Sequence, residues 1–201
     1  MECRLCPRLS EFRDELQQRY PEYHNNPVES FGPPDARLLV VGLAPGLHGA
    51  NQSGRPFTGD ASGQLLFECL HRFGFASKGT SISTDDGMVL SDCRITNAVR
   101  CVPPQNKPTP QELNTCNRFL SDELNQPAVV MVLGGDALKA VALALGLPRQ
   151  AFAFVHGAEY EMPNRGKLMV SYHPSRRNIN TGKLTTAMFE RVLERIVEIL
   201  R

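Results

Sequence analysis

The chain has no tryptophan, only four tyrosines and a formal net charge of just +1 over 201 residues. It contains no apolar run long enough to cross a membrane, and its first residues lack the apolar core of a signal peptide. We therefore expect a cytoplasmic protein with no membrane partner. A nearly neutral chain can bind a polyanion only through basic residues gathered on one face, and ring stacking must come from Phe, Tyr, His or Arg.

What is present predicts one α/β domain over residues 1–201. Short apolar segments alternate with segments of helical period, which predicts a three-layer α/β/α fold with a central, mostly parallel four-stranded sheet. The expected strands are 38–42, 95–99, 128–133 and 168–172. The expected helices are 10–20, 61–73, 110–124, 136–145 and 184–200. For helix 110–124, Thr109 is the expected N-cap, with Pro110 in first position and Glu112 completing a capping box.

Two of the expected strands run into tight loops that contain proline and polar groups. The first loop is Gly42-Leu43-Ala44-Pro45-Gly46, and the second is Ser171-Tyr172-His173-Pro174-Ser175. In open α/β sheets, ligands bind outside the carboxyl ends of the strands. The sequence therefore predicts a small molecule held between backbone amides of the first loop and the imidazole of the second.

Four of the six cysteines form two spaced pairs, which favours metal over disulfides in this chain. Cys3 and Cys6 form a C-x2-C pair, and Cys101 and Cys116 form a wide second pair. Thiolates suit zinc or an iron–sulfur cluster. The wide spacing and the prolines that stiffen it favour a [4Fe–4S] cluster over zinc, and either over four unrelated thiols.

The segment after the first loop carries two candidate functional residues. Phe57 is either a minor core contact or a stacking surface for a planar ring. Asp60 is either the N-cap of the next helix or a catalytic carboxylate. The glycines of this segment miss the dinucleotide-binding spacing, and no Walker lysine follows them, which disfavours nucleotide phosphate as the ligand.

Four segments together resemble the uracil-DNA glycosylase superfamily, and most closely its family 5, the type-B iron–sulfur enzymes. These segments are Gly42–Gly46, Gly54–Asp60, Thr96–Cys101 and His173–Asn178. Family 4 carries Glu in the second position of the first motif, where this chain has Leu43. The resemblance implies a [4Fe–4S] cluster on Cys3, Cys6, Cys101 and Cys116, and a base pocket that accepts more than uracil.

The resemblance also implies roles in base excision, in which a damaged nucleotide leaves the duplex and enters a pocket. Phe57 would stack on the base, and Asn97 would pair with the N3–H and O4 edge of uracil. His173 would hydrogen-bond O2 as negative charge develops on the leaving base, with help from backbone amides of the Gly42, Ala44 and Gly46 loop. Without the resemblance, the preferred interpretation of Asn97 is a satisfied turn amide.

The water and the DNA contacts are less defined by sequence. The first loop has no carboxylate, so we hypothesise that Asp60 orients the water or stabilises the sugar cation, with Asn51 as the other polar group available. Arg176 and Arg177, followed by Asn178, are candidates for DNA contact and for filling the gap left by the flipped base. A basic rim is expected to extend through Arg55, Arg165, Lys167 and Lys183.

Three alternatives remain at this stage. The chain could be a strict uracil glycosylase similar to family 4, or a non-catalytic iron–sulfur protein that binds nucleic acid, which the missing loop carboxylate supports. It could also be a metal-dependent hydrolase built on His48, His173 and Asp60. The leading hypothesis is a monofunctional glycosylase that acts as a monomer on DNA containing uracil or other damaged bases, since small loop residues leave room for larger bases.

Overall fold

The structure is a computed structural model that describes residues 3–163 and 165–201. Its strands are β1 (Leu38–Gly42), β2 (Cys93–Asn97), β3 (Val129–Leu133), β4 (Glu159–Glu161) and β5 (Lys167–Ser171). Its helices are α1 (Pro7–Arg19), α2 (Ala50–Ser53), α3 (Ala61–Arg72), α4 (Pro110–Glu123), α5 (Gly135–Ala144), α6 (Arg176–Asn180) and α7 (Thr186–Leu200), with a 3-10 turn, η1 (Pro104–Asn106). None of the described helices is long and apolar enough to cross a membrane.

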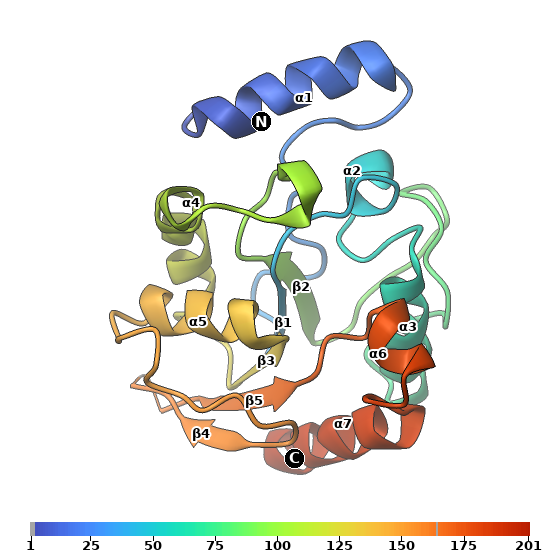
Figure 1. The fold of residues 1–201 in the computed structure, drawn as a ribbon. Helices are drawn as coiled ribbons and strands as arrows, with labels where there is room; N and C mark the ends of the chain where they lie inside the picture. The colour runs from blue at the N-terminus through green and yellow to red at the C-terminus, as the bar shows by residue number, and fades with distance from the viewer. Residues whose placement is uncertain (1–2, 164) are drawn as a thin grey trace.

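The five strands form one sheet in the order β2-β1-β3-β5-β4, as Figure 1 shows. Four strands are parallel, and β4 pairs antiparallel with β5 at one edge. The expected four-stranded sheet is therefore one strand short. β4 has no apolar run in its sequence, Glu159-Tyr160-Glu161, so only its pairing with β5 reveals it as a strand.

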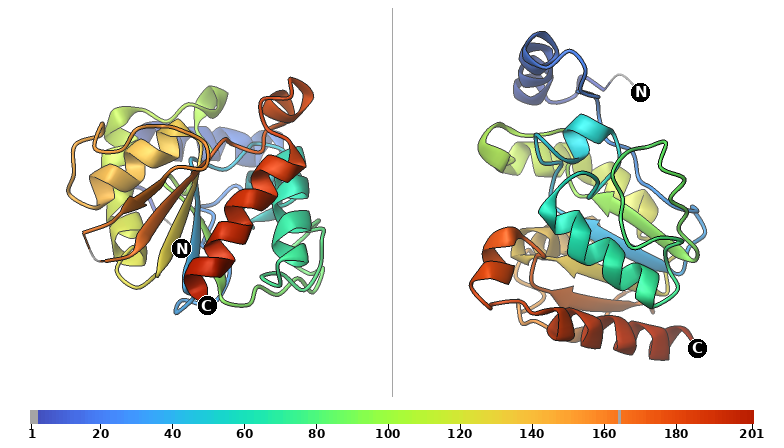
Figure 2. Two further views of the ribbon diagram at one scale, coloured as in Figure 1. Left: turned by 90° about the horizontal axis from the view of Figure 1, so that it is seen from below. Right: turned by 90° about the vertical axis from the view of Figure 1, so that its right-hand side faces the viewer.

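Helices cover both faces of the sheet, so the predicted three-layer architecture is confirmed. On one face α3 and α7 lie side by side, and on the other lie α4 and α5 (Figures 1 and 2). The strands β1 and β3 are buried throughout, which explains their unbroken apolar sequences. Alternate strand residues feed two separate cores, with Val40 and Met131 facing α3 and α7, and Val41 and Val132 facing α4 and α5.

Local signals in the sequence set several helix ends. The predicted capping box of α4 is present: the Thr109 side chain accepts from the Glu112 backbone N–H, and the Glu112 side chain accepts from the Thr109 backbone N–H. The side chain of Thr185 caps α7 by accepting from the Met188 N–H, and the helix buries one face, which includes Phe189, Leu193 and Ile196.

The N-terminal helix α1 lies apart from the sheet, beyond the carboxyl ends of the strands (Figures 1 and 2). Arg8 of α1 pairs with Glu112 of α4, and Leu9 packs against Val99. Backbone hydrogen bonds from the segment that follows the helix add to this link. The N–H of His24 donates to the Gln52 carbonyl, and the N–H of Val28 donates to the Arg100 carbonyl. The helix is thereby attached to the loops after β1 and β2, where the candidate site lies.

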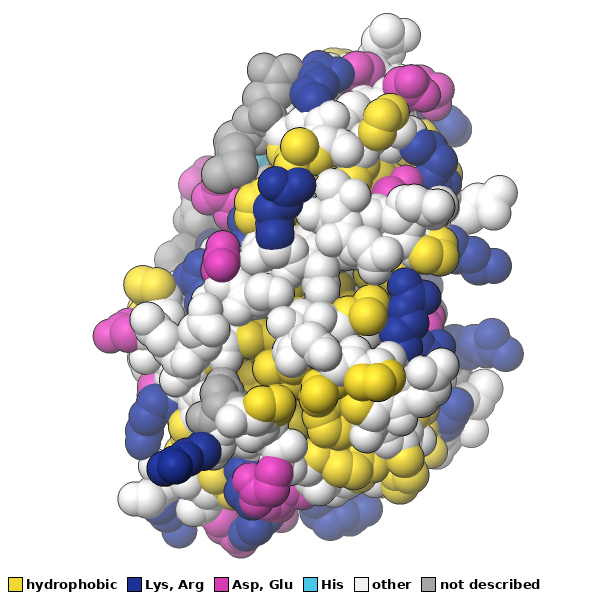
Figure 3. Space-filling view, turned by 90° about the vertical axis from the view of Figure 1, so that its left-hand side faces the viewer, with side chains coloured by type: hydrophobic (Ala, Val, Ile, Leu, Met, Phe, Trp, Pro, Cys, Tyr) yellow, Lys and Arg dark blue, Asp and Glu magenta, His cyan; other side chains and the backbone are white. Residues whose placement is uncertain are grey.

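Figure 3 shows the face of the molecule on the side of α4 and α5. Hydrophobic side chains gather over its lower half, and lysine and arginine side chains are spread singly or in small groups around its margin. The exposed hydrophobic residues of the segment between α5 and β4 include Phe154 and Val155. This face therefore offers no continuous basic surface for a polyanion.

Candidate functional site

A cavity of about 360 Å³ opens at the carboxyl ends of β1, β2 and β5. We call it the loop cavity. β1 lies between β2 and β3 in the sheet, so the chain first proceeds to one side of β1 and then crosses to the other. The cavity lies at this reversal of strand order, which is the usual ligand position in such sheets. Its lining comes mainly from the loops expected to carry the site, with additions from α2, α3 and η1: Leu43, Ala44, Pro45, Gly46, Ala50, Phe57, Asp60, Ser62, Asn97, Asn106, His173 and Ser175.

The two rings predicted to hold a planar group face the same cavity. The centroids of the Phe57 and His173 rings are 6.0 Å apart, with an angle of 32° between their planes. Phe57 is buried and has a φ of +55°, a conformation that non-glycine residues rarely adopt. Its carbonyl occupies the place that a Cβ of Gly63 would need, so the first turn of α3 holds this backbone in position.

Asn97 ends β2, directly opposite Gly42 at the end of β1. A Cβ on Gly42 would lie 2.4 Å from Asn97 Oδ1 and 2.7 Å from the Phe57 ring, so glycine is required for both side chains to reach the cavity. The Asn97 carboxamide has no hydrogen-bond partner within the described parts of the chain. The interpretation of Asn97 as a satisfied turn amide is therefore wrong, and its amide is available to a ligand.

Asp60 is the N-cap of α3, one of the two roles expected for it, and its other oxygen lies beside the loop cavity. Its Oδ1 accepts a hydrogen bond of 2.9 Å from the Gly63 N–H, which caps α3. Its Oδ2 lies against the first loop: a Cβ on Gly49 would be 2.6 Å from this oxygen, and a Cβ on Gly46 would be 3.7 Å from it. The carboxylate that the first loop lacks is thus supplied from the start of α3, which removes the main support for a non-catalytic protein.

Burial lowers the pKa of His173, and the nearby negative charge of Asp60 only partly opposes this shift. The imidazole is therefore neutral at physiological pH. Asn178 lies behind this loop, where its Nδ2 donates to the His173 carbonyl at 2.8 Å. Asn178 does not line the loop cavity but borders a neighbouring one, so its position is that of a support for His173.

Two polar residues that follow the first loop, His48 and Asn51, point away from the cavity. Asn51 is fully buried and donates to Asn25 Oδ1 at 2.9 Å. His48 Nδ1 is 3.0 Å from the Tyr23 hydroxyl. Asn51 is therefore not placed to orient a water in the cavity. The hydrolase alternative loses its basis, because His48 does not line the cavity that contains His173 and Asp60.

The predicted basic rim is only partly present. Arg176 and Arg177 are exposed in α6, and Lys183 lies over the Tyr172 ring beside the loop cavity. Arg55, in contrast, is buried and paired with Asp86 at 2.8 Å, where it secures the segment after α3.

Arg165 and Lys167 do not belong to the rim either. Lys167 begins β5, at the end of the strand opposite His173, and pairs with Glu159 and Glu161 of β4. Arg165 lies in the turn before it. Their expected role in a rim is wrong because they occupy the amino-terminal ends of the strands.

Asn106, Ser62 and Ser175 line the loop cavity without having been predicted. Asn106 comes from η1 and has a φ of +56°. Its only signal in the sequence is an asparagine among prolines, a composition that predicts a turn but not the direction of a side chain. The two serines adjoin predicted residues, and Ser175 caps α6.

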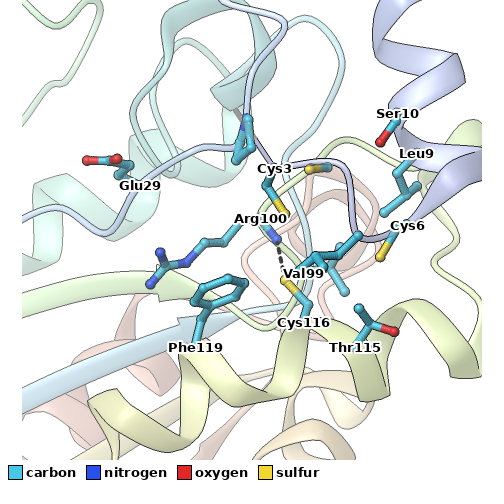
Figure 4. Close-up of a pocket in the computed structure, with 13 residues that line it drawn as sticks. Cys3, Cys6, Leu9, Ser10, Glu29, Val99, Arg100, Thr115, Cys116 and Phe119 are labelled. Atoms are coloured by element: carbon cyan, nitrogen blue, oxygen red, sulfur yellow. Dashed lines mark hydrogen bonds between the residues drawn. The ribbon is translucent and has the colours of Figure 1, made fainter. Parts of the chain in front are cut away.

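Cys3, Cys6, Cys101 and Cys116 line a second, smaller cavity between α1, α4 and the loop after β2, which we call the cysteine cavity. Figure 4 shows Cys3, Cys6 and Cys116 extending toward this common space. The rest of its lining is mainly apolar and includes Leu9, Val99 and Phe119. The backbone N–H of Arg100 donates to Cys116 Sγ at 3.4 Å, as the dashed line in Figure 4 marks.

Burial and neighbouring charged groups shift the pKa values of these thiols. Burial raises the pKa of Cys101 to about 12, with Arg13 opposing the shift and the other three thiols adding to it. Burial also raises the pKa of Cys116 and of Cys6. The remaining two cysteines, Cys69 and Cys93, lie in the core between the sheet and α3, as expected for buried hydrophobic residues.

Comparison with known proteins agrees with this arrangement. Residues 29–197 match the family described as the Uracil DNA glycosylase superfamily. The chain is 48% identical over 199 residues to a type-5 uracil-DNA glycosylase of Thermus thermophilus, covering 95% of this chain and 90% of that protein. For a type-5 enzyme of Pyrobaculum aerophilum, the identity is 43% over 201 residues, with 96% and 87% covered. A type-4 enzyme of the same organism is 31% identical over 160 residues, with 77% and 74% covered.

Proposed function

Because this chain belongs to the uracil DNA glycosylase superfamily and to its type-5 family, we propose that it removes uracil from DNA by hydrolysing the N-glycosidic bond. The product is an abasic site. The observation that carries the proposal is the loop cavity, in which Phe57 from the segment between α2 and α3 meets Asn97 and His173 from the ends of β2 and β5. The flipped base enters this cavity with its ring against Phe57.

Base recognition is assigned to Asn97. A carboxamide both donates and accepts, which matches the N3–H and O4 edge of uracil, whereas cytosine presents the opposite polarity there. Because the Asn97 amide is buried and lies against Gly42, its position is fixed before the base arrives. A wrong base would leave this amide unpaired inside the protein, which is costly.

His173 is assigned to the leaving group. Bond cleavage leaves negative charge on the departing base, and a neutral imidazole N–H hydrogen-bonds O2 as that charge grows. Burial keeps His173 neutral, and Asn178 holds its backbone, so the donor is in place before reaction. Backbone N–H groups of residues 42–46 border the same space and assist it.

Asp60 is assigned to the water or to the cationic sugar. Its Oδ1 is fixed by the Gly63 N–H, so the carboxylate cannot rotate freely, and Oδ2 remains beside the first loop. A carboxylate held in this way accepts a proton from an attacking water or stabilises positive charge on the sugar. In this proposal Asp60 therefore both caps α3 and assists the hydrolysis of the glycosidic bond.

The proposed substrate range is broader than uracil. The side of the cavity formed by the first loop and α2 carries small residues, namely Ala44, Gly46 and Ala50, and it leaves space beside the base. Such a pocket rejects bulkier bases weakly. We expect activity on 5-substituted uracils or deaminated purines, and we expect Arg176 and Arg177 to contact the DNA of a monomeric enzyme.

The four thiols of the cysteine cavity are assigned to a [4Fe–4S] cluster. The donor set is that of such a cluster, and the four thiols line one shared cavity. An arginine, Arg13, is buried beside them with two nitrogens that lack a partner, which fits a negatively charged group. When bound, the cluster would tie α1 to the loop after β2, a structural role.

The test is incubation of the purified protein with a uracil-containing oligonucleotide, followed by alkali, which cleaves the strand at abasic sites. We expect cleavage at the uracil position only. Asn97→Ala should lower excision by roughly 10- to 100-fold, since a good base-edge contact contributes about 1–3 kcal/mol. Asn125→Ala, at an exposed asparagine that follows α4 and lies outside the cavity, is the matched control and should retain near wild-type activity.

Binding of the oligonucleotide without any alkali-sensitive site would overturn the proposal and favour a binding protein. A panel of duplexes with other damaged bases tests the substrate range. Excision of uracil alone across that panel would restrict the function to strict uracil removal.

A further inference from the structure

Arg13 is a buried cation that makes no hydrogen bond or ion pair with a carboxylate of the described residues, although its charge helps to lower the pKa of the exposed Asp14. Its side chain is only 3% exposed, on the buried face of α1 together with Leu9 and Leu16. Nη2 donates to the Cys3 carbonyl at 2.6 Å, but Nε and Nη1 are buried without any hydrogen-bond partner. An isolated charge in such a place is strongly disfavoured unless a negative group compensates it.

No carboxylate of the described residues pairs with Arg13. Its neighbour Asp14 is exposed and hydrogen-bonded to Arg4. The group that Arg13 contacts is the backbone of Cys3, and Leu9, on the same buried face of α1, lines the cysteine cavity. The guanidinium therefore lies beside the four-thiol set and not beside an acidic side chain.

The other arginines near the thiols differ from Arg13. The guanidinium of Arg100 is paired with Glu123 at 2.6 Å, and only its backbone N–H contacts Cys116. Arg118 is exposed on α4. Arg100 also has a buried Nε without a partner, but of these three arginines Arg13 has two such nitrogens, no carboxylate partner and a side-chain bond to the backbone of a cysteine.

We propose that Arg13 is a positioning residue for the iron–sulfur cluster, fixing the Cys3 backbone and supplying the positive charge that four buried thiolates require. This inference rests on the cluster assigned above. A guanidinium suits the task because its planar fork can bind one carbonyl while further N–H groups remain available to a second acceptor. The charge would favour retention of the cluster and would make its reduction, which adds negative charge, easier.

The test compares Arg13→Gln and Arg13→Lys with the wild-type holoenzyme. Arg19→Gln is the matched control, because Arg19 is an exposed arginine of the same helix that lies over the Tyr20 ring. Three properties are measured: iron per chain, the rate at which a chelator bleaches the visible absorbance, and the midpoint potential of the cluster. We expect Arg13→Gln to bleach about tenfold faster or more, a usual effect of removing an outer-sphere partner, and to have a lower potential.

We expect Arg13→Lys to keep a potential near that of the wild type, since it keeps the charge, and Arg19→Gln to match the wild type throughout. Wild-type bleaching and potential in Arg13→Gln would overturn the proposal. So would fast bleaching with an unchanged potential, which would indicate packing alone. If Arg13→Gln does not fold, Arg13→Lys carries the test, and loss of its cluster or a clearly lowered potential would overturn the assigned charge role.

The same measurements separate this inference from the proposed function. Wild-type protein that contains iron but excises no uracil would contradict the glycosylase assignment and leave the role of Arg13 standing. Wild-type protein that excises uracil without iron would overturn the cluster and the role of Arg13 together.

Discussion

The loop cavity and the cysteine cavity lie on either side of the segment that leaves β2, yet their linings are opposite in kind. The loop cavity has a volume of about 360 Å³ and contains polar groups without protein partners, such as the Asn97 amide and Asp60 Oδ2. The cysteine cavity has a volume of about 30 Å³ and is lined by sulfur and apolar side chains. An open, unpaired polar site suits a ligand that enters and leaves, whereas buried thiols suit one that stays.

The two cavities share a short piece of backbone. Asn97 faces the loop cavity, and Cys101 faces the cysteine cavity four residues later. Between them, the N–H groups of Ala98 and Val99 donate to the carbonyls of Gly42 and Leu43. The cluster would thus hold the strand end that positions the base-reading amide, without touching the base.

The largest expected effect is a loss of excision rate at the loop cavity without a loss of stability. Asp60→Asn should lower single-turnover excision by about 100-fold or more, because the carboxylate is lost. Asn caps helices as well as Asp, so the melting temperature and the iron content should be unchanged. DNA binding, measured by fluorescence anisotropy, should also be unchanged. Near-normal excision would leave Asp60 only its capping role.

The corresponding change in the cysteine cavity is Cys116→Ser. We expect loss of nearly all iron and a lower melting temperature, since binding energy at such a site is also folding energy. Cys69→Ser, at a buried cysteine outside the cavity, should keep its iron and is the control. Iron retained at the wild-type level in Cys116→Ser would remove this residue from the ligand set.

Two glycine substitutions test how closely the loop cavity is packed. Gly42→Ala would bring a Cβ to 2.4 Å from Asn97 Oδ1 and should lower excision by roughly 10- to 100-fold by displacing Asn97 and Phe57. Gly46→Ala places its Cβ at an ordinary distance of 3.7 Å from Asp60 and should be nearly neutral. Equal activities of the two variants would contradict the packing described for Asn97.

A smaller effect is expected at the exposed arginines. Arg177→Gln should weaken DNA binding a few-fold and reduce the slope of log affinity against log salt by about one, as expected for one lost phosphate contact. Lys167→Gln, at the opposite ends of the strands, is the control and should leave the slope unchanged. An unchanged slope in Arg177→Gln would place DNA elsewhere.

The smallest effect concerns pH. Burial lowers the pKa of both His156 and His173 below the ordinary 6.5. Below pH 6.5 the unfolded chain therefore binds protons that the folded chain resists, and the free energy of unfolding falls as pH decreases. The slope is at most about 1.4 kcal/mol per pH unit for each histidine. Denaturant unfolding of the wild type and of His156→Gln between pH 5 and 8 measures it, and an unchanged slope in the variant would contradict the shift at His156.

The sequence by itself determined the parallel strands, the long helices, the loops that form the cavity and the two cysteine pairs. Apolar runs and helical periods are local patterns that survive folding, and tight turns require particular residues at particular places. The motif residues Asn97 and His173 could be found in this way because they adjoin strand ends, and Phe57 because it is an aromatic residue among the glycines and polar residues of the segment before α3. The edge strand β4 could not, since its own residues show no strand pattern.

Only the tertiary structure decided which way the loop side chains point. Asn51 and His48 turn toward the segment after α1, Arg55 is buried against Asp86, and Asp60 reaches back to the first loop. A loop has no repeating period that assigns a residue to one face, so partners far away in the chain fix these directions. Arg13 shows this best. A charged residue on a helix is normally exposed, and Arg13 is buried only because α1 packs this face beside the cysteine cavity.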